Sequence, residues 1–295
     1  MFLGPLGGEP SAARLSGGGL LFIVATPIGN LGDISLRALD TLRTADVVAC
    51  EDTRHARRLL DHHGIRAQLL ALHEHNEQQA AEKLIALLTA GKSVALISDA
   101  GTPAVSDPGA RAVAAVREAG FRVVPVPGPN AAIAALSAGG LEGPFHFIGF
   151  LPAKAGARRT ALAALKSIPA TLVFYEAPHR IEETAADLAA LLEAQREIVI
   201  ARELTKLFEQ IERMPLAAAP AWLAADENHR RGEFVLLVSA PPPPSVNGGI
   251  DAESERVLRL LLAELPVKQA AKLAAAITGQ AKNALYDRAL ALKDS

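Results

Sequence analysis

Two loops of small and rigid residues form the clearest candidate binding site in the sequence. One loop begins with S-D-A-G-T-P at Ser98 and runs to Gly109, and the other reads P-V-P-G-P-N-A from Pro125 to Ala131. Each follows an apolar run typical of a buried strand, and ligands of open α/β sheets bind outside the carboxyl ends of the strands. Small residues let a ligand reach main-chain groups, and prolines hold the loops in place before binding. We therefore expect a cofactor pocket here; the alternative is that both loops are plain connections.

A third turn, T-P-I-G-N-L from Thr26, follows the first apolar run. It lacks the G-x-G-x-x-G spacing that brings a backbone close to a pyrophosphate, and Pro27 removes one N–H donor. The run G-x-x-x-x-G-K-[ST] is absent from the chain as well. These features argue against a nicotinamide dinucleotide site and against a P-loop.

Carboxylates follow three further predicted strands. Glu51 and Asp52 stand in C-E-D-T-R-H, Glu176 stands in F-Y-E-A-P-H-R, and a third run reads A-R-E-L-T-K. A carboxylate at a strand end can point into a cleft, and two such ends in the second half suggest a site between two domains. The alternative is that Asp52 or Thr53 only caps a helix.

The composition excludes several classes of protein. Of 295 residues 50% are hydrophobic and 21% are charged, which is ordinary for a globular protein with a sizeable core. Cys50 is the single cysteine, so a disulfide scaffold and multi-thiolate metal sites are excluded, and a reducing compartment, the cytoplasm, is expected. The histidine pair in L-H-E-H-N lacks a second ligand cluster, so we expect no metal. No signal peptide or membrane span is predicted.

The net charge of −2 leaves no general basic field, so any RNA must meet a local basic patch. Arginines follow Thr53, and P-A-K-A-G-A-R-R forms a second cluster on a predicted exposed loop and helix start. The stretch 266–295 carries five basic and two acidic residues, a balance of +3. A solvated surface is the alternative interpretation of each cluster.

The elements that position these residues alternate between strand and helix. Near-continuous apolar strands between helices predict an α/β fold with a mostly parallel sheet covered on both faces. The strands are predicted at 20–25, 47–50, 69–72, 94–97 and 123–126, and the helices at 36–44, 53–63, 77–90 and 109–119. After a break near 139–144, strands are predicted at 146–149, 171–175, 197–201 and 233–239, and helices at 157–166, 181–192, 251–265 and 267–292 with a break at 278–279.

This pattern divides the chain into five parts. We expect a flexible leader at 1–19, an α/β cofactor-binding domain at 20–140, a second α/β domain at 141–240, a Pro/Gly linker at 241–250 and a small helical extension at 251–295.

Nine runs in the chain together resemble the tetrapyrrole methylase fold family, and within it the branch that modifies small-subunit ribosomal RNA. The runs are T-P-I-G-N-L, A-C-E-D-T-R-H, A-L-H-E-H-N-E, S-D-A-G-T-P, V-V-P-V-P-G-P, G-F-L-P-A-K, F-Y-E-A-P-H-R, A-R-E-L-T-K and G-E-F-V-L-L-V. They occur in family order between about Leu20 and Ser239, and K-N-A-L-Y from Lys282 fits the family's helical extension.

The resemblance implies two α/β domains with S-adenosylmethionine (S-adenosyl-L-methionine) in the cleft between them. It implies methyl transfer to the ribose 2′-hydroxyl of a cytidine in the decoding region of 16S ribosomal RNA, within the small ribosomal subunit, and a homodimer. Carried over by position, the cofactor contacts fall on Pro27, Ser98, Asp99, Ala100, Gly101, Thr102, Pro127, Gly128, Pro129, Asn130, Ala131 and Tyr175. A tetrapyrrole C-methyltransferase and a non-catalytic ribosome-assembly factor are the alternatives.

The remaining site residues follow from what this reaction requires. A ribose hydroxyl is a poor nucleophile, so a general base should help remove its proton. The candidates by position are Glu51, Asp52, Glu176 and His179, and one sequence does not choose among them. The expected RNA contacts are Arg54, Arg58, Lys154, Arg158, Arg159, Lys268, Lys272 and Lys282.

Overall fold

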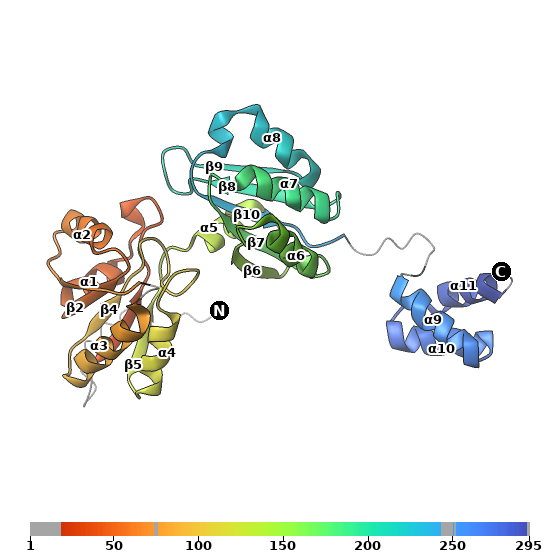
Figure 1. The fold of residues 1–295 in the computed structure, drawn as a ribbon, viewed down its shortest axis with the longest axis horizontal. Helices are drawn as coiled ribbons and strands as arrows, with labels where there is room; N and C mark the ends of the chain where they lie inside the picture. The colour runs from red at the N-terminus through yellow and green to blue at the C-terminus, as the bar shows by residue number, and fades with distance from the viewer. Residues whose placement is uncertain (1–18, 74–75, 243–249, 251, 294–295) are drawn as a thin grey trace, which may run out of the picture. The chain divides into compact units, whose positions relative to one another are not determined.

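The computed structural model describes residues 19–73, 76–242, 250 and 252–293 (Figure 1). The chain separates into two compact units, Met1–Pro241 and Pro242–Ser295. The predicted leader, apart from Gly19, and most of the predicted linker lie outside the described residues.

The first sheet has five parallel strands in the order β3-β2-β4-β1-β5. They are β1 (Leu20–Val24), β2 (Val47–Cys50), β3 (Gln68–Ala71), β4 (Val94–Leu96) and β5 (Arg122–Val126). Leu21 pairs with Val94 on one side and with Val123 on the other, which places β1 inside the sheet. The predicted α/β class and the parallel sheet are confirmed.

Helices cover both faces of this sheet because its strands alternate their side chains between two cores. The helices are α1 (Leu36–Thr44), α2 (Thr53–His62), α3 (Glu77–Thr89) and α4 (Ala110–Glu118). Leu21 packs with the buried residues of α3 and α4, whereas Val24 packs with those of α1 and α2. Near-continuous apolar strands are therefore buried on both faces.

Neighbouring strands β1 and β4 lead to helices on opposite faces. The chain leaves β1 toward α1, and it leaves β4 toward α4. Loops that diverge in this way open a crevice at the carboxyl ends of the two strands, the place where ligands bind in open α/β sheets. Thr26 and Gly101, one from each loop, form a bridge across this point.

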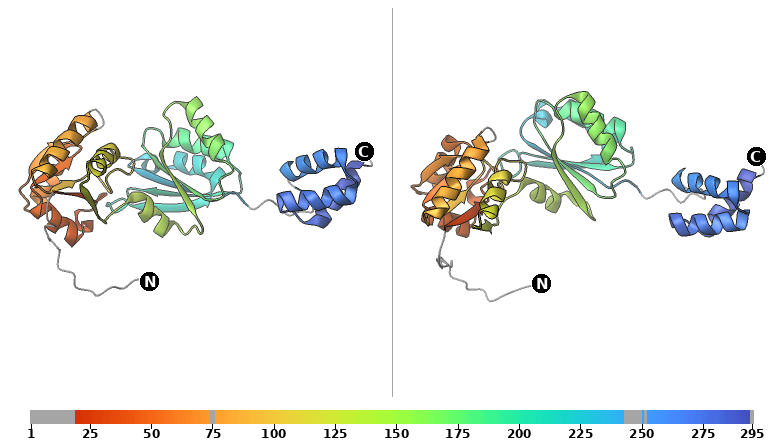
Figure 2. Two further views of the ribbon diagram at one scale, coloured as in Figure 1. Left: turned by 90° about the horizontal axis from the view of Figure 1, so that it is seen from below. Right: turned by 60° about the horizontal axis from the view of Figure 1, so that its bottom comes forward.

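The second sheet is mixed, in the order β6-β7-β10-β8-β9. Its strands are β6 (Phe145–Phe150), β7 (Thr171–Glu176), β8 (Glu197–Arg202), β9 (Gln210–Pro215) and β10 (Phe234–Val238). Only the β6–β7 pair is parallel. Helices α6 (Ala155–Leu165), α7 (Ile181–Leu191) and α8 (Ala219–Ala225) pack on one face, and α5 (Ala131–Gly139) packs on the other (Figure 2).

Three of these elements were not expected from the sequence: α5, β9 and α8. Helix α5 packs on the second sheet, where a β-carbon on Gly139 would lie 2.7 Å from Cδ1 of Leu237. The predicted domain boundary at residue 140 groups this helix with the first sheet. The domain ranges as a whole stay predictions.

The second unit is a bundle of three helices, α9 (Ala252–Glu264), α10 (Val267–Thr278) and α11 (Lys282–Lys293). Leu258, Ala270 and Leu285 are fully buried and join the three helices in one core. The predicted break falls at Gly279, whose φ of +74° ends α10 in the left-handed conformation. Short 3-10 turns elsewhere are η1 (Leu31–Asp33), η3 (Leu216–Ala218) and η4 (Glu227–Arg230).

Across the described part of the chain, the helices are too short or too polar to pass through a membrane.

Candidate active site

Hydrogen bonds join the three loops at the carboxyl edge of the first sheet. The amide of Thr26 donates to the carbonyl of Gly101 at 2.8 Å, and the amide of Gly101 donates back at 3.1 Å. The Thr26 hydroxyl donates to the carbonyl of Ser98 at 3.2 Å, and the Thr102 hydroxyl donates to the carbonyl of Pro129 at 3.0 Å. The loops are thus connected to one another and keep their places without a ligand.

A cavity of about 330 Å³ lies against these loops. Its first wall comes from the loops after β1, β4 and β5, and includes Gly101 and Thr102. Its second wall comes from the ends of β6, β7 and β10 and from the loop after β8, and includes Tyr175 and Lys206. A cavity between two sheets, walled by small residues with a few polar groups, is typical of a small-molecule site.

Aromatic side chains form part of the second wall. The amide of Ala132 donates to the Tyr175 hydroxyl at 3.2 Å, which fixes the phenol at the start of α5. Burial raises the pKa of Tyr175, so the phenol stays neutral. The ring centroids of Phe147 and Phe150 lie 5.1 and 5.7 Å from that of Tyr175. Phe150 is 54% exposed although it lines the cavity.

The structure brings half of the expected cofactor contacts to the cavity wall. These are Ala100, Gly101, Thr102, Asn130, Ala131 and Tyr175. The cavity wall does not include Pro27, Ser98, Asp99, Pro127, Gly128 or Pro129, which lie in the same loops. The roles of all twelve as cofactor contacts stay predictions.

Among the expected bases, Glu176 borders the cavity but its carboxylate is engaged by protein groups. Its oxygens accept from the Thr184 hydroxyl at 2.6 Å and from the Ala177 amide at 2.9 Å. Arg180 Nε lies 3.2 Å from Glu176 Oε1, and the Glu176 side chain is fully buried. A carboxylate held by Thr184, Ala177 and Arg180 is suited to keeping this part of the cavity wall in place.

The other three expected bases, Glu51, Asp52 and His179, lie outside the cavity wall. Asp52 is the N-cap of α2, and hydrogen bonds from Arg54 lower the pKa of Asp52 to about 2. A carboxylate with so low a pKa is a weak base. His179 is exposed, and Glu51 is half-buried near Asp107.

Asp107 lines the cavity and was not among the expected bases. Burial, followed by the negative charge of Glu51, raises the pKa of Asp107 to about 6; a hydrogen bond from Ser98 opposes this, and Asp99 adds to it. In the sequence, S-D-P-G precedes a helix and has the composition of an ordinary helix start, so nothing local distinguishes Asp107.

Lys206 was also missed. Its ammonium lies 2.8 Å from Glu203 Oε1 and 2.7 Å from Glu233 Oε2. Burial opposes the charge, but the two hydrogen-bonded carboxylates raise the pKa of Lys206. A β-carbon on Gly29 would lie 2.5 Å from Lys206 Cγ, so this side chain packs against the turn after β1.

The expectation that Arg158 lies on an exposed surface is wrong. Its side chain is 2% exposed, and its Nε donates to Asp187 Oδ2 at 2.7 Å. A second ion pair joins Arg158 to Glu183 at 3.1 Å. A guanidinium committed in this way has no reach to an RNA phosphate, so we remove Arg158 from the proposed RNA contacts.

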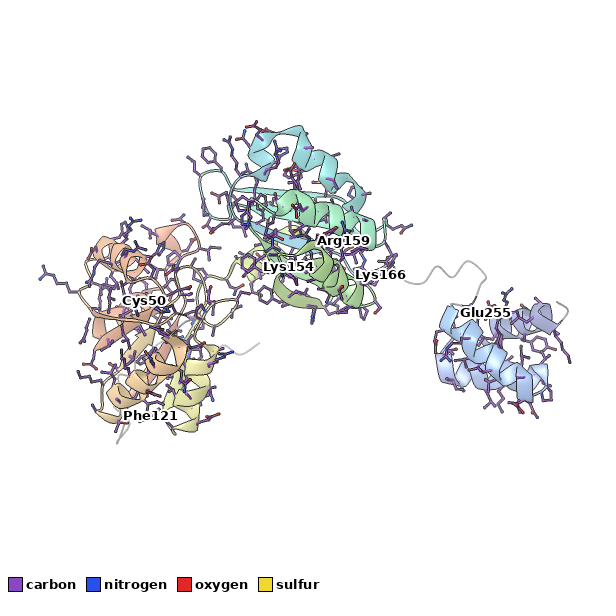
Figure 3. All side chains as sticks on the ribbon, viewed as in Figure 1. Cys50, Phe121, Lys154, Arg159, Lys166 and Glu255 are labelled. Atoms are coloured by element: carbon purple, nitrogen blue, oxygen red, sulfur yellow. The ribbon has the colours of Figure 1, made fainter. Side chains whose placement is uncertain are left out.

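The remaining expected RNA contacts are on the surface: Arg54, Arg58, Lys154, Arg159, Lys268, Lys272 and Lys282. Lys154 is the N-cap of α6, Arg159 lies within this helix and Lys166 is its C-cap (Figure 3). Two of the set have carboxylate partners, since Arg54 pairs with Asp52 and Arg159 pairs with Asp187, each at 2.8 Å. Their contacts with RNA stay predictions.

No group of three or more potential metal ligands occurs among the residues that the structure describes. His75, the second histidine of the H-x-H run, lies outside them.

Comparison with known proteins defines the class to which this fold and cavity belong. The profile of the family described as "Tetrapyrrole (Corrin/Porphyrin) Methylases" matches residues 20–220. A second profile, "RsmI C-terminal HTH domain", matches residues 248–293, which covers the three-helix bundle. The larger unit thus belongs to the tetrapyrrole methylase family.

Curated relatives narrow this class. A protein of Pseudomonas aeruginosa named "Ribosomal RNA small subunit methyltransferase I" is 55% identical over 92% of this chain and 97% of its own length. Relatives of the same name from Escherichia coli O157:H7 and Neisseria meningitidis serogroup A are 53% and 48% identical, over 92% and 94% of this chain and 95% of each relative. The chain belongs to the ribosomal RNA small subunit methyltransferase I family.

Solved structures agree on the fold. The uroporphyrin-III-C-methyltransferase of Thermus thermophilus aligns with a TM-score of 0.54 at 22% identity, over 75% of this chain and 94% of that one. The methyltransferase CobJ aligns with a TM-score of 0.58 at 19% identity, over 78% and 97%. At such identities the likeness concerns the fold alone.

Proposed function

We propose that this protein transfers a methyl group from S-adenosylmethionine to the ribose 2′-hydroxyl of a cytidine in the decoding region of 16S ribosomal RNA. The main observation in support of methyl transfer is a cavity that lies between the two β-sheets and is walled by pre-ordered loops. Membership of the family, whose named members act on small-subunit ribosomal RNA, supports the substrate. The ribose position follows from the resemblance of the sequence.

The residues of the cavity fit this cofactor. Gly101, Thr102, Asn130 and Ala131 would hold it through small side chains and main-chain groups, and Tyr175 would close the opposite side. When bound, S-adenosylmethionine supplies a methyl group activated by a positively charged sulfur. The carboxylates on or next to the cavity wall outnumber the cationic groups there, which favours a ligand with a positive charge.

The aromatic wall suits a nucleobase. Sequence-specific RNA recognition commonly stacks a splayed-out base on an aromatic side chain, and Phe150 combines an exposed ring with a place on the cavity wall. Lys154, which is exposed at the N-cap of α6 four residues later, is the proposed contact to a phosphate of the same nucleotide segment. A single flipped cytidine would thus be held by its base and by its backbone.

The chain's own contribution to rate is mainly alignment. Loops fixed by Thr26 and Thr102 hold the two reactants with little reorganisation, and alignment can lower a barrier by several kcal/mol, on the order of 7–11 at best. A general base adds roughly 10²–10⁴-fold.

We also propose that the protein works in the cytoplasm and that it forms a homodimer. Light scattering of the purified full chain is the direct test of the dimer.

Methyl transfer to two acceptors tests the proposal against the tetrapyrrole alternative. The purified chain is incubated with methyl-labelled S-adenosylmethionine and either unmethylated small ribosomal subunits or a uroporphyrinogen-type macrocycle. We expect label in the ribosomal RNA alone. Label in the macrocycle, or an absorbing macrocycle that copurifies with the protein, would support the alternative. Absence of transfer to both acceptors would favour a non-catalytic assembly factor.

A further inference from the structure

The ionisable side chains around the cavity differ in how far protein partners already engage them. Glu176 accepts from Thr184 and Ala177, and Glu233 pairs with Lys206. Lys206 itself is held by two carboxylates. These groups are committed to neighbours, so they are poorly placed to exchange a proton with a substrate.

Asp107 is different in its surroundings. It lines the cavity, half-buried, and the groups that face it are carboxylates, a hydroxyl and a phenol. Glu51 comes from the end of β2, Asp99 and Ser98 from the end of β4, and Tyr175 from β7. Burial and then the like charges favour the protonated acid, and against an opposing hydrogen bond from Ser98 they raise the pKa of Asp107 to about 6.

The loop that carries Asp107 is held in a strained conformation. Ala104 and Ser106 have φ values of +64° and +63°, a region that costs non-glycine residues roughly 1–3 kcal/mol. Ser106 Oγ lies so close to β6 that a β-carbon on Gly149 would approach it to 2.6 Å. Because the backbone at Ala104 and Ser106 is fixed in this way, the side chain of Asp107 has a defined position on the cavity wall.

A carboxylate from α3 fixes the far end of the same loop. Glu77 Oε1 accepts hydrogen bonds from the amides of Gly109 at 3.0 Å and Arg111 at 2.9 Å, at the start of α4. The loop is therefore held by the first sheet, by α3 and by the second sheet. Strain that persists because its surroundings enforce it is typical of functional sites.

We propose that Asp107 accepts the proton of the attacking ribose 2′-hydroxyl, a role that rests on the function proposed above. The hydroxyl oxygen forms its new bond to the methyl carbon as the carbon–sulfur bond breaks, with that electron pair remaining on sulfur. The O–H proton moves to a carboxylate oxygen of Asp107, which then releases it to water. A carboxylate with a pKa near 6 is ionised at neutral pH and is a stronger base than an ordinary aspartate.

Asp107→Asn tests the role, with Asp40→Asn on the exposed surface of α1 as a matched control. We expect Asp107→Asn to lower the single-turnover rate at saturating cofactor and small subunits by roughly 10²–10⁴-fold. Its melting temperature and its calorimetric affinity for S-adenosylhomocysteine should stay close to those of the wild type. A rate within threefold of the wild type would overturn the proposal.

The pH dependence separates a base from a merely structural residue. The wild-type rate should rise through about pH 6 and then level, and Asp107→Asn should lack this limb. Carboxyl NMR of the protein without cofactor should show one resonance titrating near pH 6 that the same variant removes. A limb that persists in Asp107→Asn, or the absence of that resonance, would count against Asp107.

Glu51→Gln gives an independent measurement. Because it removes a like charge, it should move the limb to lower pH. Loss of the plateau in Glu51→Gln, with Asp107→Asn active, would assign the base to Glu51 instead. If the wild type methylates ribose and Asp107→Asn is unimpaired, the role of Asp107 is wrong but the proposed function stands. If the wild type methylates no ribose, both the role of Asp107 and the proposed function are wrong.

Discussion

The hydroxyl of Thr102 donates a hydrogen bond of 3.0 Å to the carbonyl of Pro129. This bond joins the loop after β4 to the loop after β5, two segments that lie on either side of β1 in the sheet. Both residues belong to the region where the cofactor is proposed to bind. The bond therefore orders the proposed cofactor site before any ligand arrives.

Thr102→Val should weaken cofactor binding without unfolding the protein. The change keeps the shape of the side chain and removes a hydrogen bond worth about 0.5–1.5 kcal/mol, so affinity for S-adenosylhomocysteine should fall roughly 2–12-fold. Calorimetry measures this directly, with Thr102→Ser as the control that keeps the hydroxyl. Equal affinity in the valine and serine variants would show that the bond does not order the site.

Gly101→Ala should reduce both stability and cofactor affinity, whereas Gly120→Ala should reduce stability alone. Both glycines have positive φ, +80° and +83°, so an alanine at either costs about 1–2 kcal/mol in the folded state. Gly101 lines the cavity and a β-carbon there would meet Ile28 Cγ2 at 3.4 Å, while a β-carbon on Gly120 would meet nothing within 4 Å. Thermal unfolding and calorimetry of both variants check the difference. Unchanged cofactor affinity in Gly101→Ala would contradict the placement of the site.

Arg158→Met should destabilise the protein far more than Arg159→Met. Arg158 is 2% exposed and balances the buried charge of Asp187; losing one partner of a buried pair typically costs about 3–5 kcal/mol. Arg159 is 63% exposed, and an exposed pair contributes about 0–1 kcal/mol. Urea unfolding should separate the two variants. Similar midpoints would mean that Arg158 does not hold this part of the fold.

The same ion pair predicts a dependence of stability on pH. Burial would raise the pKa of Asp187, but hydrogen bonds from Arg159 and Arg158 lower it below the unfolded value. The folded state therefore gains stability from Asp187 above the unfolded pKa of about 3.9 and loses it as pH falls through the folded pKa. The stability gap between wild type and Asp187→Asn should be constant above about pH 5 and shrink below pH 4. A gap independent of pH down to 2 would contradict this.

Lysines of the three-helix bundle should act on RNA affinity rather than on cofactor affinity. Replacing Lys268, Lys272 and Lys282 with alanine should weaken binding to small subunits. It should also reduce the slope of log affinity against log salt, by roughly 0.7–0.9 for each phosphate that no longer meets a lysine. Lys83→Ala on α3 is the control. Unaltered salt dependence in the triple variant would give the bundle another role.

Periodicity and apolar runs are enough to predict the first sheet and its helices. In β1 and β2 every residue is apolar and both faces are buried, which is the pattern that a parallel sheet requires. Strand β9 was missed because Q-I-E-R-M-P carries charges at an edge. Helix α5 was missed because A-A-I-A-A-L-S-A-G is apolar nearly throughout and so lacks a helical period, although only one of its faces packs on the second sheet and Ile133 is exposed.

The candidate site could be predicted at the level of loops but not of single side chains. Glycine and proline patterns after β4 and β5 locate the cavity wall. Arg158 and Arg159 are identical and adjacent in sequence, and only the turn of α6 buries one and exposes the other. The raised pKa of Asp107 depends on its burial in the folded protein and on Glu51, which lies at the end of β2, so the sequence around Asp107 does not reveal it.

The position of the transferred methyl group tests the central claim most directly. Unmethylated small subunits are incubated with the full chain and trideuteromethyl-labelled S-adenosylmethionine, and the ribosomal RNA is digested to nucleosides for mass spectrometry. The proposed function predicts one labelled nucleoside, a cytidine that loses an unlabelled cytosine on fragmentation and keeps the label on its ribose. A label that stays on the base, or no labelled nucleoside, would contradict it.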